Sequence, residues 1–228
     1  MAFSLPSDER GHTTKGAYLE FMKSRTESDS HPRHHMDMQA HHAISEKAIF
    51  DAKLDDRLAD FGYEIDVPEN LVFIPSTLQG ACLLQVQPHR GNHTARLIKG
   101  DDDDSCHPPA YHIMVANRLK AIFPALEEEC GDHGTNIAKK TQKALDHIST
   151  DIIKKIQHKP REARLTKLYA YFNPGHPRGC GGEDSVTKTG VDTCPVERDH
   201  RNQRKGPNQE QEGITYPHCA PYTLEPGK

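Results

Sequence analysis

The chain has 228 residues, a net charge of -4, no tryptophan and only 34% hydrophobic residues. This composition favours a modest core with polar insertions or tails over a large packed sheet, and the charge gives no sign of a polyanionic partner. There is no run of 18 apolar residues and no basic region followed by an apolar stretch at the start, so neither a membrane span nor a secretory signal peptide is expected.

The first 35 residues are polar and are expected to form an arm, with some helix near Ala17–Ser24. The histidines of HPRHH, residues 31–35, are expected to be exposed. Ser45 is placed to cap a helix over residues 46–61, which carries apolar side chains near one face, and Gly62 suits its end. The apolar positions of that helix are Ile49, Leu54, Leu58 and Phe61.

Two short extended pieces are predicted next, YEIDV at residues 63–67 and LVFIP at residues 71–75, on either side of a turn at Pro68–Asn70. A further helix is predicted over Ala110–Phe123. Apolar residues then recur at helical spacing, which predicts a long amphipathic helix. They are Ile137, Thr141, Leu145, Ile148, Ile152 and Ile156.

From Asn173 onward, glycine, proline and charged residues dominate, which predicts a loop-rich region. The six cysteines include no CxxC pair, and in a chain without an export signal they are first interpreted as reduced thiols. Four residues of this region offer the ligand types of a structural Zn²⁺ site. They are His176, Cys180, Cys194 and Cys219. A disulfide, or a polar tail with unrelated cysteines, is the alternative.

Sixteen histidines are the unusual feature of the composition. Two are adjacent, in AHH at Ala40–His42, and two more, His89 and His93, lie four residues apart in PHRGNH. Residues four apart share one face of a helix, so both imidazoles can reach one ion, and one AHH histidine would make a third nitrogen ligand. The other AHH histidine could take a proton from water, because free imidazole titrates near neutral pH.

The order of AHH, then ENLVFIP, then HRGNH resembles the AHH family of the HNH (ββα-metal, His-Me finger) endonuclease superfamily, over roughly residues 36–120. The resemblance implies a hairpin with AHH on its first strand and LVFIP on its second, packed against an HRGNH helix. The expected fold is therefore α+β and mostly helical, with a small ββα-metal core. The expected divisions are an arm at 1–35, the nuclease core at 36–124, a basic helical extension at 125–172 and a loop-rich region at 173–228.

Carried over residue by residue, the resemblance implies that His41, His89 and His93 bind one divalent metal ion, Mg²⁺ or else Zn²⁺, Ni²⁺ or Mn²⁺. His42 would be the general base, and Asn70 would brace the loop behind it. Arg90 would neutralise phosphate charge or, as the alternative, face solvent. In the family the last histidine usually runs into Pro-Ala-Tyr. Here a dozen or so residues separate His93 from HPPAY, so His107 is the alternative to His93 as ligand.

The resemblance implies a metal-dependent, largely sequence-nonspecific endonuclease acting on DNA, with RNA left open as a substrate. It also implies a bacterial toxin that is neutralised by an immunity protein. Delivery would use a signal-peptide-independent route, with a secretion-apparatus or chaperone partner, from the producing cytoplasm to that of a target cell. By default, the basic face of the long helix is expected to be in contact with solvent only. Beside a nuclease site, the same face would bind the phosphates of the substrate. Its candidate residues are Lys139, Lys140, Lys143, Lys154, Lys155, Arg161 and Arg164.

Two other classes remain open. One is a zinc-dependent binding module, in which histidines and cysteines only hold the fold and the basic helix binds nucleic acid or protein. The other is a metal hydrolase acting on a small phosphoester or a peptide. The second lacks an HExxH motif or a carboxylate-rich ligand set.

Overall fold

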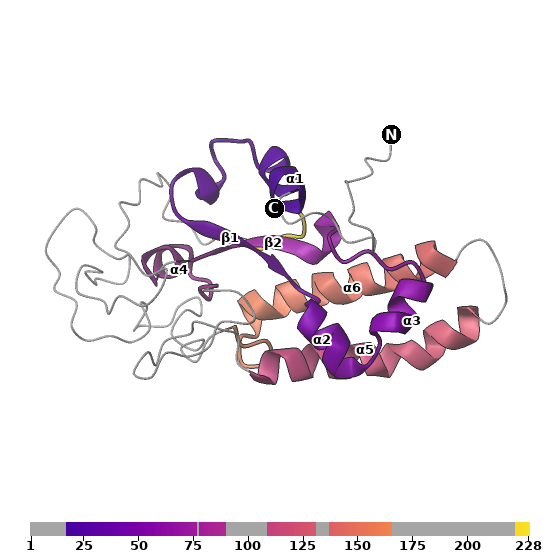
Figure 1. The fold of residues 1–228 in the computed structure, drawn as a ribbon. Helices are drawn as coiled ribbons and strands as arrows, with labels where there is room; N and C mark the ends of the chain where they lie inside the picture. Colours follow the sequence, from indigo (N-terminus) through magenta and orange to yellow (C-terminus); the bar gives the residue numbers. More distant parts are fainter. Residues whose placement is uncertain (1–16, 77, 90–108, 131–136, 166–221) are drawn as a thin grey trace, which may run out of the picture.

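The structure, a computed structural model, describes residues 17–76, 78–89, 109–130, 137–165 and 222–228 (Figure 1). These residues are mostly helical and contain one two-stranded antiparallel sheet, as expected for an α+β fold. The elements are α1 (Ala17–Arg25), β1 (Met38–His42), α2 (Glu46–Ala52), α3 (Asp55–Asp60), β2 (Leu71–Pro75), α4 (Leu78–Leu84), α5 (Pro109–Cys130) and α6 (Ile137–His158), with 3-10 turns at Pro32–His34 and Pro68–Asn70. No helix in the described ranges has the length and apolar character needed to cross a membrane.

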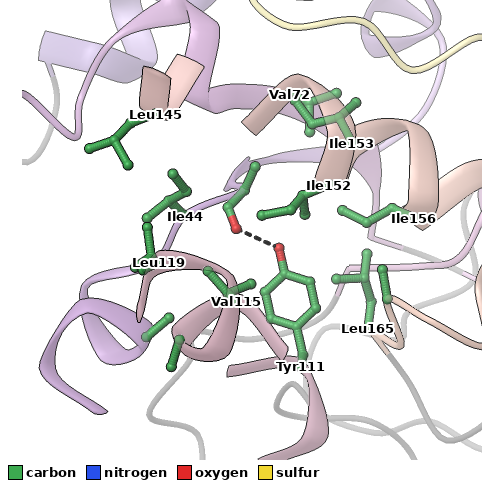
Figure 2. Packing of buried hydrophobic residues seen from close by; sticks show 14 of the residues in the cluster. Ile44, Val72, Tyr111, Val115, Leu119, Leu145, Ile152, Ile153, Ile156 and Leu165 are labelled. Carbon is green, nitrogen blue, oxygen red and sulfur yellow. Dashed lines mark hydrogen bonds between the residues drawn. The ribbon is translucent and has the colours of Figure 1, made fainter. Parts of the chain in front are cut away.

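The sheet lies between α1 and the larger helices (Figure 1). On one face, Met22 of α1 is fully buried against Leu71 and Phe73 of β2. On the other face, Val72 and Ile74 belong to the main core, which also includes buried residues of α5 and α6 (Figure 2). The core residues of those two helices are Tyr111, Val115, Leu119, Leu145, Ile152, Ile153 and Ile156. The sheet is therefore covered on both faces, and alternate side chains of β2 contact α1 or the main core.

The register of the hairpin sets the directions of the two AHH histidines. His41 lies opposite Val72 and His42 lies opposite Leu71. Successive side chains of a strand point to opposite faces. His41 is therefore on the face of the main core, and His42 is on the face that α1 covers.

The segment between the two strands is helical, as predicted, but it is broken. The Ser45 hydroxyl accepts a hydrogen bond from the Ala48 amide and caps α2. Lys53 then adopts a left-handed conformation (φ 59°), and its amide bonds back to α2, so residues 46–61 form two helices rather than one. The prediction of a single helix was wrong because this turn buries Leu54 against the core. Gly62, at φ +70°, lies just beyond the second helix, as expected.

The prediction of an extended piece at YEIDV is wrong, because residues 63–67 form neither strand nor helix. Side chains from elsewhere take up its backbone groups: the Glu64 amide donates to Oε1 of Gln142, and the Ile65 carbonyl accepts from Nδ2 of Asn70. The strand predicted at LVFIP is confirmed as β2.

Both predicted long helices are present. The helix expected at residues 110–123 continues to Cys130, with Pro124 inside it. The amphipathic helix is confirmed as α6, and its buried side chains include Leu145, Ile152 and Ile156. Since helices α5 and α6 both contribute to the main core, the basic helix also serves as a packing element.

Residues 222–228 pack against the free edge of β2, although they form no regular strand. The Gly227 amide donates to the Leu71 carbonyl at 2.7 Å, and the Phe73 amide donates to the Lys228 carbonyl at 2.8 Å. His31 and His35 are only partly exposed, so the expectation that they are exposed was wrong, whereas His34 is exposed as expected. Nε2 of His31 lies 2.9 Å from the Tyr222 hydroxyl. The four candidate zinc ligands of the C-terminal region, His176, Cys180, Cys194 and Cys219, lie outside the described residues.

Candidate active site

His41 lies in the core beneath the N-terminal turn of α5. Its side chain is fully buried, and its Nε2 lies 2.9 Å from the Tyr111 hydroxyl. That hydroxyl has a single hydrogen, which it donates to the Ala43 carbonyl at 2.8 Å (dashed in Figure 2). Nε2 of His41 must then be the donor to Tyr111, and the lone pair of the neutral ring is on Nδ1. Burial raises the pKa of Tyr111, which keeps the hydroxyl protonated.

His89 reaches the same place from a different segment. The centroids of the His41 and His89 rings are 4.8 Å apart, and both side chains are buried. The His89 amide donates to the Pro75 carbonyl at the end of β2. The structure therefore brings together two of the three predicted metal ligands, from positions 48 residues apart in the chain.

Gln87 fixes the segment that carries His89. Its side-chain amide donates to the carbonyls of Ile156 and Ala163 and accepts from the Leu165 amide. Because the residue is buried and uses both ends of its amide, it holds this irregular segment against the end of α6. Sequence reasoning missed Gln87, since an isolated glutamine gives no signal of such a role.

The two histidines suit a metal ion by their chemistry. A ligating histidine commonly donates its other ring N–H to a neighbour, which is the arrangement of His41 with Tyr111. Imidazole nitrogen is a ligand for Zn²⁺, Ni²⁺ and related ions. Within the described ranges no group of three or more His, Cys, Asp or Glu side chains is arranged to hold a metal.

The remaining ligand candidates, His93 and His107, lie outside the described residues, as does Arg90. His89 itself lies in a segment without helix, and the rest of HRGNH is not described, so the predicted HRGNH helix stays a prediction.

His42 has different neighbours from His41. Its Nε2 lies 2.7 Å from Oδ1 of Asp66, and its ring meets the ring of Tyr18 edge-on at a centroid distance of 5.2 Å. The His42 side chain is 20% exposed, so solvent reaches it. Asp66 was missed by sequence reasoning because it belongs to the segment interpreted as a strand. Burial and the nearby Asp66 charge raise the pKa of Tyr18.

Asn70 is fully buried and uses its whole side-chain amide. Oδ1 accepts from the Ile44 amide at 2.7 Å and from the Ser149 hydroxyl at 2.8 Å. Nδ2 donates to the carbonyls of Ile44 and Ile65. The residue therefore joins the segment after β1, the segment before β2 and helix α6, which suits the bracing position implied by the resemblance.

A third buried histidine, His112, follows Tyr111 in the chain. Nδ1 of His112 is 3.0 Å from the Ser45 hydroxyl, and burial lowers the pKa of His112. Because the same hydroxyl caps α2, this contact joins α2 to the first turns of α5. The site is thus held by α5 from two adjacent residues, Tyr111 and His112.

The candidate DNA-binding residues of α6 differ in their surroundings. At 100° per residue, Lys139, Lys143 and Lys154 fall on one stripe, and all three are exposed. Lys140 is also exposed, as are Arg161 and Arg164 beyond the helix. Lys155 instead pairs with Glu162 at 2.7 Å. Lys139, Lys143 and Lys154 therefore form a stripe of exposed positive charge that runs along the axis of α6.

In a comparison with family models, residues 22–159 match AHH, a nuclease family of the HNH/ENDO VII superfamily with conserved AHH. The matched range includes the AHH segment, Asn70 and His89. Searches of curated proteins and of solved structures gave no significant match. Since the family match spans more than half of the 228 residues and contains the site, the chain belongs to the AHH family of nucleases.

Proposed function

We propose that this nuclease is a metal-dependent, largely sequence-nonspecific endonuclease that hydrolyses DNA phosphodiester bonds. The observation that carries the proposal is the juxtaposition of the buried His41 and His89 rings, 4.8 Å apart. Two imidazoles buried together in a core are costly unless hydrogen bonds or a shared ion satisfy their nitrogens. A metal site at this place is the arrangement that membership of the HNH/ENDO VII superfamily supports.

His41 and His89 would hold the ion, with His93 as the third ligand and His107 as its alternative. Mg²⁺, Zn²⁺, Ni²⁺ and Mn²⁺ are the candidates. An ion held there would supply Lewis acidity to the scissile phosphate and would stabilise the charge on the leaving oxygen. The remaining chemistry belongs to side chains of the chain itself.

His42 is the proposed general base. Its partly exposed ring lies at the end of β1, one residue from His41 and on the other face of the strand. It takes a proton from the water that attacks phosphorus, and Asn70 holds the adjoining backbone at Ile44. The products carry 5′-phosphates because the 3′ oxygen leaves.

Sequence independence follows from the kind of contact available. Exposed lysines such as Lys139, Lys143 and Lys154 contact phosphates, and phosphate contacts fix position without reading bases. Arg90 is a further candidate for neutralising the cleaved phosphate. RNA remains a possible substrate, because phosphodiester hydrolysis does not itself require deoxyribose.

The biological role that fits this activity is that of a bacterial toxin. Such an enzyme requires an immunity protein in the producing cell, and its delivery requires a secretion-apparatus or chaperone partner. It would act in the cytoplasm of a target cell. These parts of the proposal rest on the resemblance to toxin-type members of the family.

The test is cleavage of supercoiled plasmid DNA and of RNA by the purified chain, with each of the four metal ions in turn and with EDTA. We expect metal-dependent nicking and linearisation of DNA, abolished by EDTA. His42→Ala should lose at least about 100-fold in rate, since a general base contributes on that order. A matched control is His34→Ala, which removes an exposed histidine outside the site.

Three results would contradict the proposal. Plasmid that stays intact with every ion would exclude a nuclease of this kind, and cleavage that survives EDTA would exclude the metal. Full activity in His42→Ala would remove the assigned base. Comparing His93→Ala with His107→Ala by metal content then decides which residue completes the site.

A further inference from the structure

We propose that Asp66 is the positioning residue of the general base, holding His42 in the tautomer with the proton on Nε2, so that Nδ1 is the atom that takes the proton from water. This inference rests on the proposed function. It concerns a residue that no sequence motif marks and that lies 24 positions from His42.

The contact is short and partly shielded from water. Oδ1 of Asp66 is 2.7 Å from Nε2 of His42, and the two side chains are 13% and 20% exposed. By contrast, one partner is 52% exposed in the Lys47–Asp51 pair. Water competes less well for a shielded pair, so its geometry is better defined than that of an exposed one.

The chemistry of the two groups sets the tautomer. A carboxylate oxygen accepts hydrogen bonds, so the nitrogen of His42 that faces Asp66 must be the one that bears the hydrogen. In a neutral ring the other nitrogen, Nδ1, then has the lone pair. A base must present a lone pair to the nucleophile, and in this arrangement the lone pair is that of Nδ1 of His42.

Two backbone groups just before Asp66 are held by side chains from other segments. The Glu64 amide donates to Gln142 of α6 at 3.0 Å, and the Ile65 carbonyl accepts from Asn70 at 3.0 Å. Residues 63–67 have no regular structure of their own, so these side-chain contacts replace the backbone pairing that a strand would supply. The loop of residues 63–67, held by these contacts, therefore places the Asp66 carboxylate next to His42.

Tyr18 limits the other freedom of the His42 ring. The two rings meet edge-on, at 5.2 Å and an angle of 61°. With a carboxylate at Nε2 and an aromatic ring alongside, rotation of the imidazole is restricted while part of the side chain stays open to solvent. A positioned base with access to water is the arrangement that hydrolysis requires.

In the reaction, the water oxygen forms its bond to phosphorus as its proton moves to Nδ1 of His42. The bond from phosphorus to the leaving 3′ oxygen breaks, and that oxygen takes a proton from solvent. His42 becomes an imidazolium whose Nε2–H donates to the Asp66 carboxylate, which stabilises the new charge. The proton on Nδ1 then returns to solvent, so the ring ends as it began.

The first measurement is the tautomer itself, in the full chain, from ¹⁵N–¹H correlation of the histidine rings, with His42 assigned by its loss in His42→Gln. We expect His42 in the Nε2–H form in the parent and a mixture of forms in Asp66→Ala. Finding the Nδ1–H form in the parent would overturn the inference whatever the Asp66 variants show.

The second measurement is steady-state cleavage of a short DNA duplex by Asp66→Ala, Asp66→Asn and Asp66→Glu. We expect kcat to fall about tenfold or more in Asp66→Ala with KM nearly unchanged, because orientation of the base matters to the chemical step only. Asp66→Glu should recover part of the loss. The matched control is Asp51→Asn, which removes the carboxylate of an ion pair on α2.

The outcomes separate this inference from the proposed function. If His42→Ala is inactive while Asp66→Ala retains the parent kcat and tautomer, Asp66 has no positioning role and the inference fails alone. If Asp66→Ala changes KM and kcat equally with Asp66→Glu giving no recovery, the effect is structural and the inference fails. If His42→Ala is fully active, the proposed base is wrong.

Discussion

The hydroxyl of Tyr111 lies 2.9 Å from Nε2 of His41 and joins the first turn of α5 to the strand that carries AHH. The same hydroxyl donates to the Ala43 carbonyl, so one buried oxygen holds both the side chain of the candidate ligand and the backbone two residues beyond it. The residues concerned are 70 positions apart. The relation gives α5 a direct influence on the proposed metal site.

Replacing Tyr111 with phenylalanine should reduce both stability and metal binding. The change leaves the Ala43 carbonyl and Nε2 of His41 in the core without this hydroxyl, which costs about 1–3 kcal/mol. Because the tautomer of His41 is no longer set, metal affinity should fall by about tenfold or more. Urea denaturation and calorimetric titration with Zn²⁺ or Ni²⁺ measure the two effects.

Tyr63→Phe is the control for that variant. The Tyr63 hydroxyl is buried and has no hydrogen-bond partner among the described residues. Its removal should leave stability equal or slightly higher, with metal affinity unchanged. Equal losses in both variants would show that the loss in Tyr111→Phe does not come from the hydrogen bonds of its hydroxyl.

Asn70→Ala should be strongly destabilising. It removes hydrogen bonds to the backbone of Ile44 and Ile65 and to the Ser149 hydroxyl in a fully buried place, and a loss of about 3 kcal/mol or more is expected. Chemical denaturation measures it. Asn117→Ala, which changes an exposed asparagine of α5, should cost close to nothing. A small loss in Asn70→Ala would mean that water replaces these contacts.

Stability should fall as the pH is lowered through the range set by His31. Burial, with the charges of Arg33, His34 and Lys228, lowers the pKa of His31 from 6.5 to about 4. Between these values the unfolded chain binds the proton and the folded chain does not. The free energy of unfolding therefore decreases as the pH falls from 6.5 to about 4. Below about pH 4, His31 causes no further decrease.

The measurement is urea denaturation across that pH range for the parent and for His31→Gln. The glutamine keeps a polar group near the Tyr222 hydroxyl but has no titrating ring, so its curve should be flatter. Some slope should remain, since burial also lowers the pKa of His112. Identical slopes in the two proteins would exclude His31 as the source.

The lysine stripe of α6 should set the salt dependence of DNA binding. Replacing Lys139, Lys143 and Lys154 with glutamine should weaken binding uniformly across sequences and lower the slope of log K against log salt by about 3. Titration of a fluorescent duplex at several salt concentrations measures this. Lys155→Gln is the control, because its ammonium already pairs with Glu162, and it should change the slope less. An unchanged slope in the triple variant would exclude the stripe as a phosphate track.

Features that depend on local pattern were predictable. The period of apolar residues predicted α6, and the Ser45 cap and Gly62 marked the limits of the helical part of the segment between the strands. The motif order predicted the family and a hairpin with AHH on one strand and LVFIP on the other. Helix period and capping can be predicted because they depend on neighbouring residues, whereas the family and the hairpin came from the resemblance of the three motifs.

Features that depend on contacts with residues far away in the chain could not be predicted from the sequence. Residues 63–67 have the composition of a strand, but Gln142 and Asn70 take up their backbone groups, and no local pattern reveals that. The break at Lys53 arises because a left-handed turn buries Leu54 against the core. Propensity is a weak signal that tertiary contacts override.

The order of the motifs along the chain indicated the family and, through the resemblance, the two-stranded hairpin and the mostly helical α+β class. The opposite directions of His41 and His42 follow from the alternation of side chains along a strand. The groups that those histidines meet depend on contacts between distant segments: Tyr111 and His89 on one face of β1, Asp66 and Tyr18 on the other. The reason is physical. A partner's identity depends on which buried polar groups must satisfy one another once the core closes, and that requirement couples residues far apart in the chain.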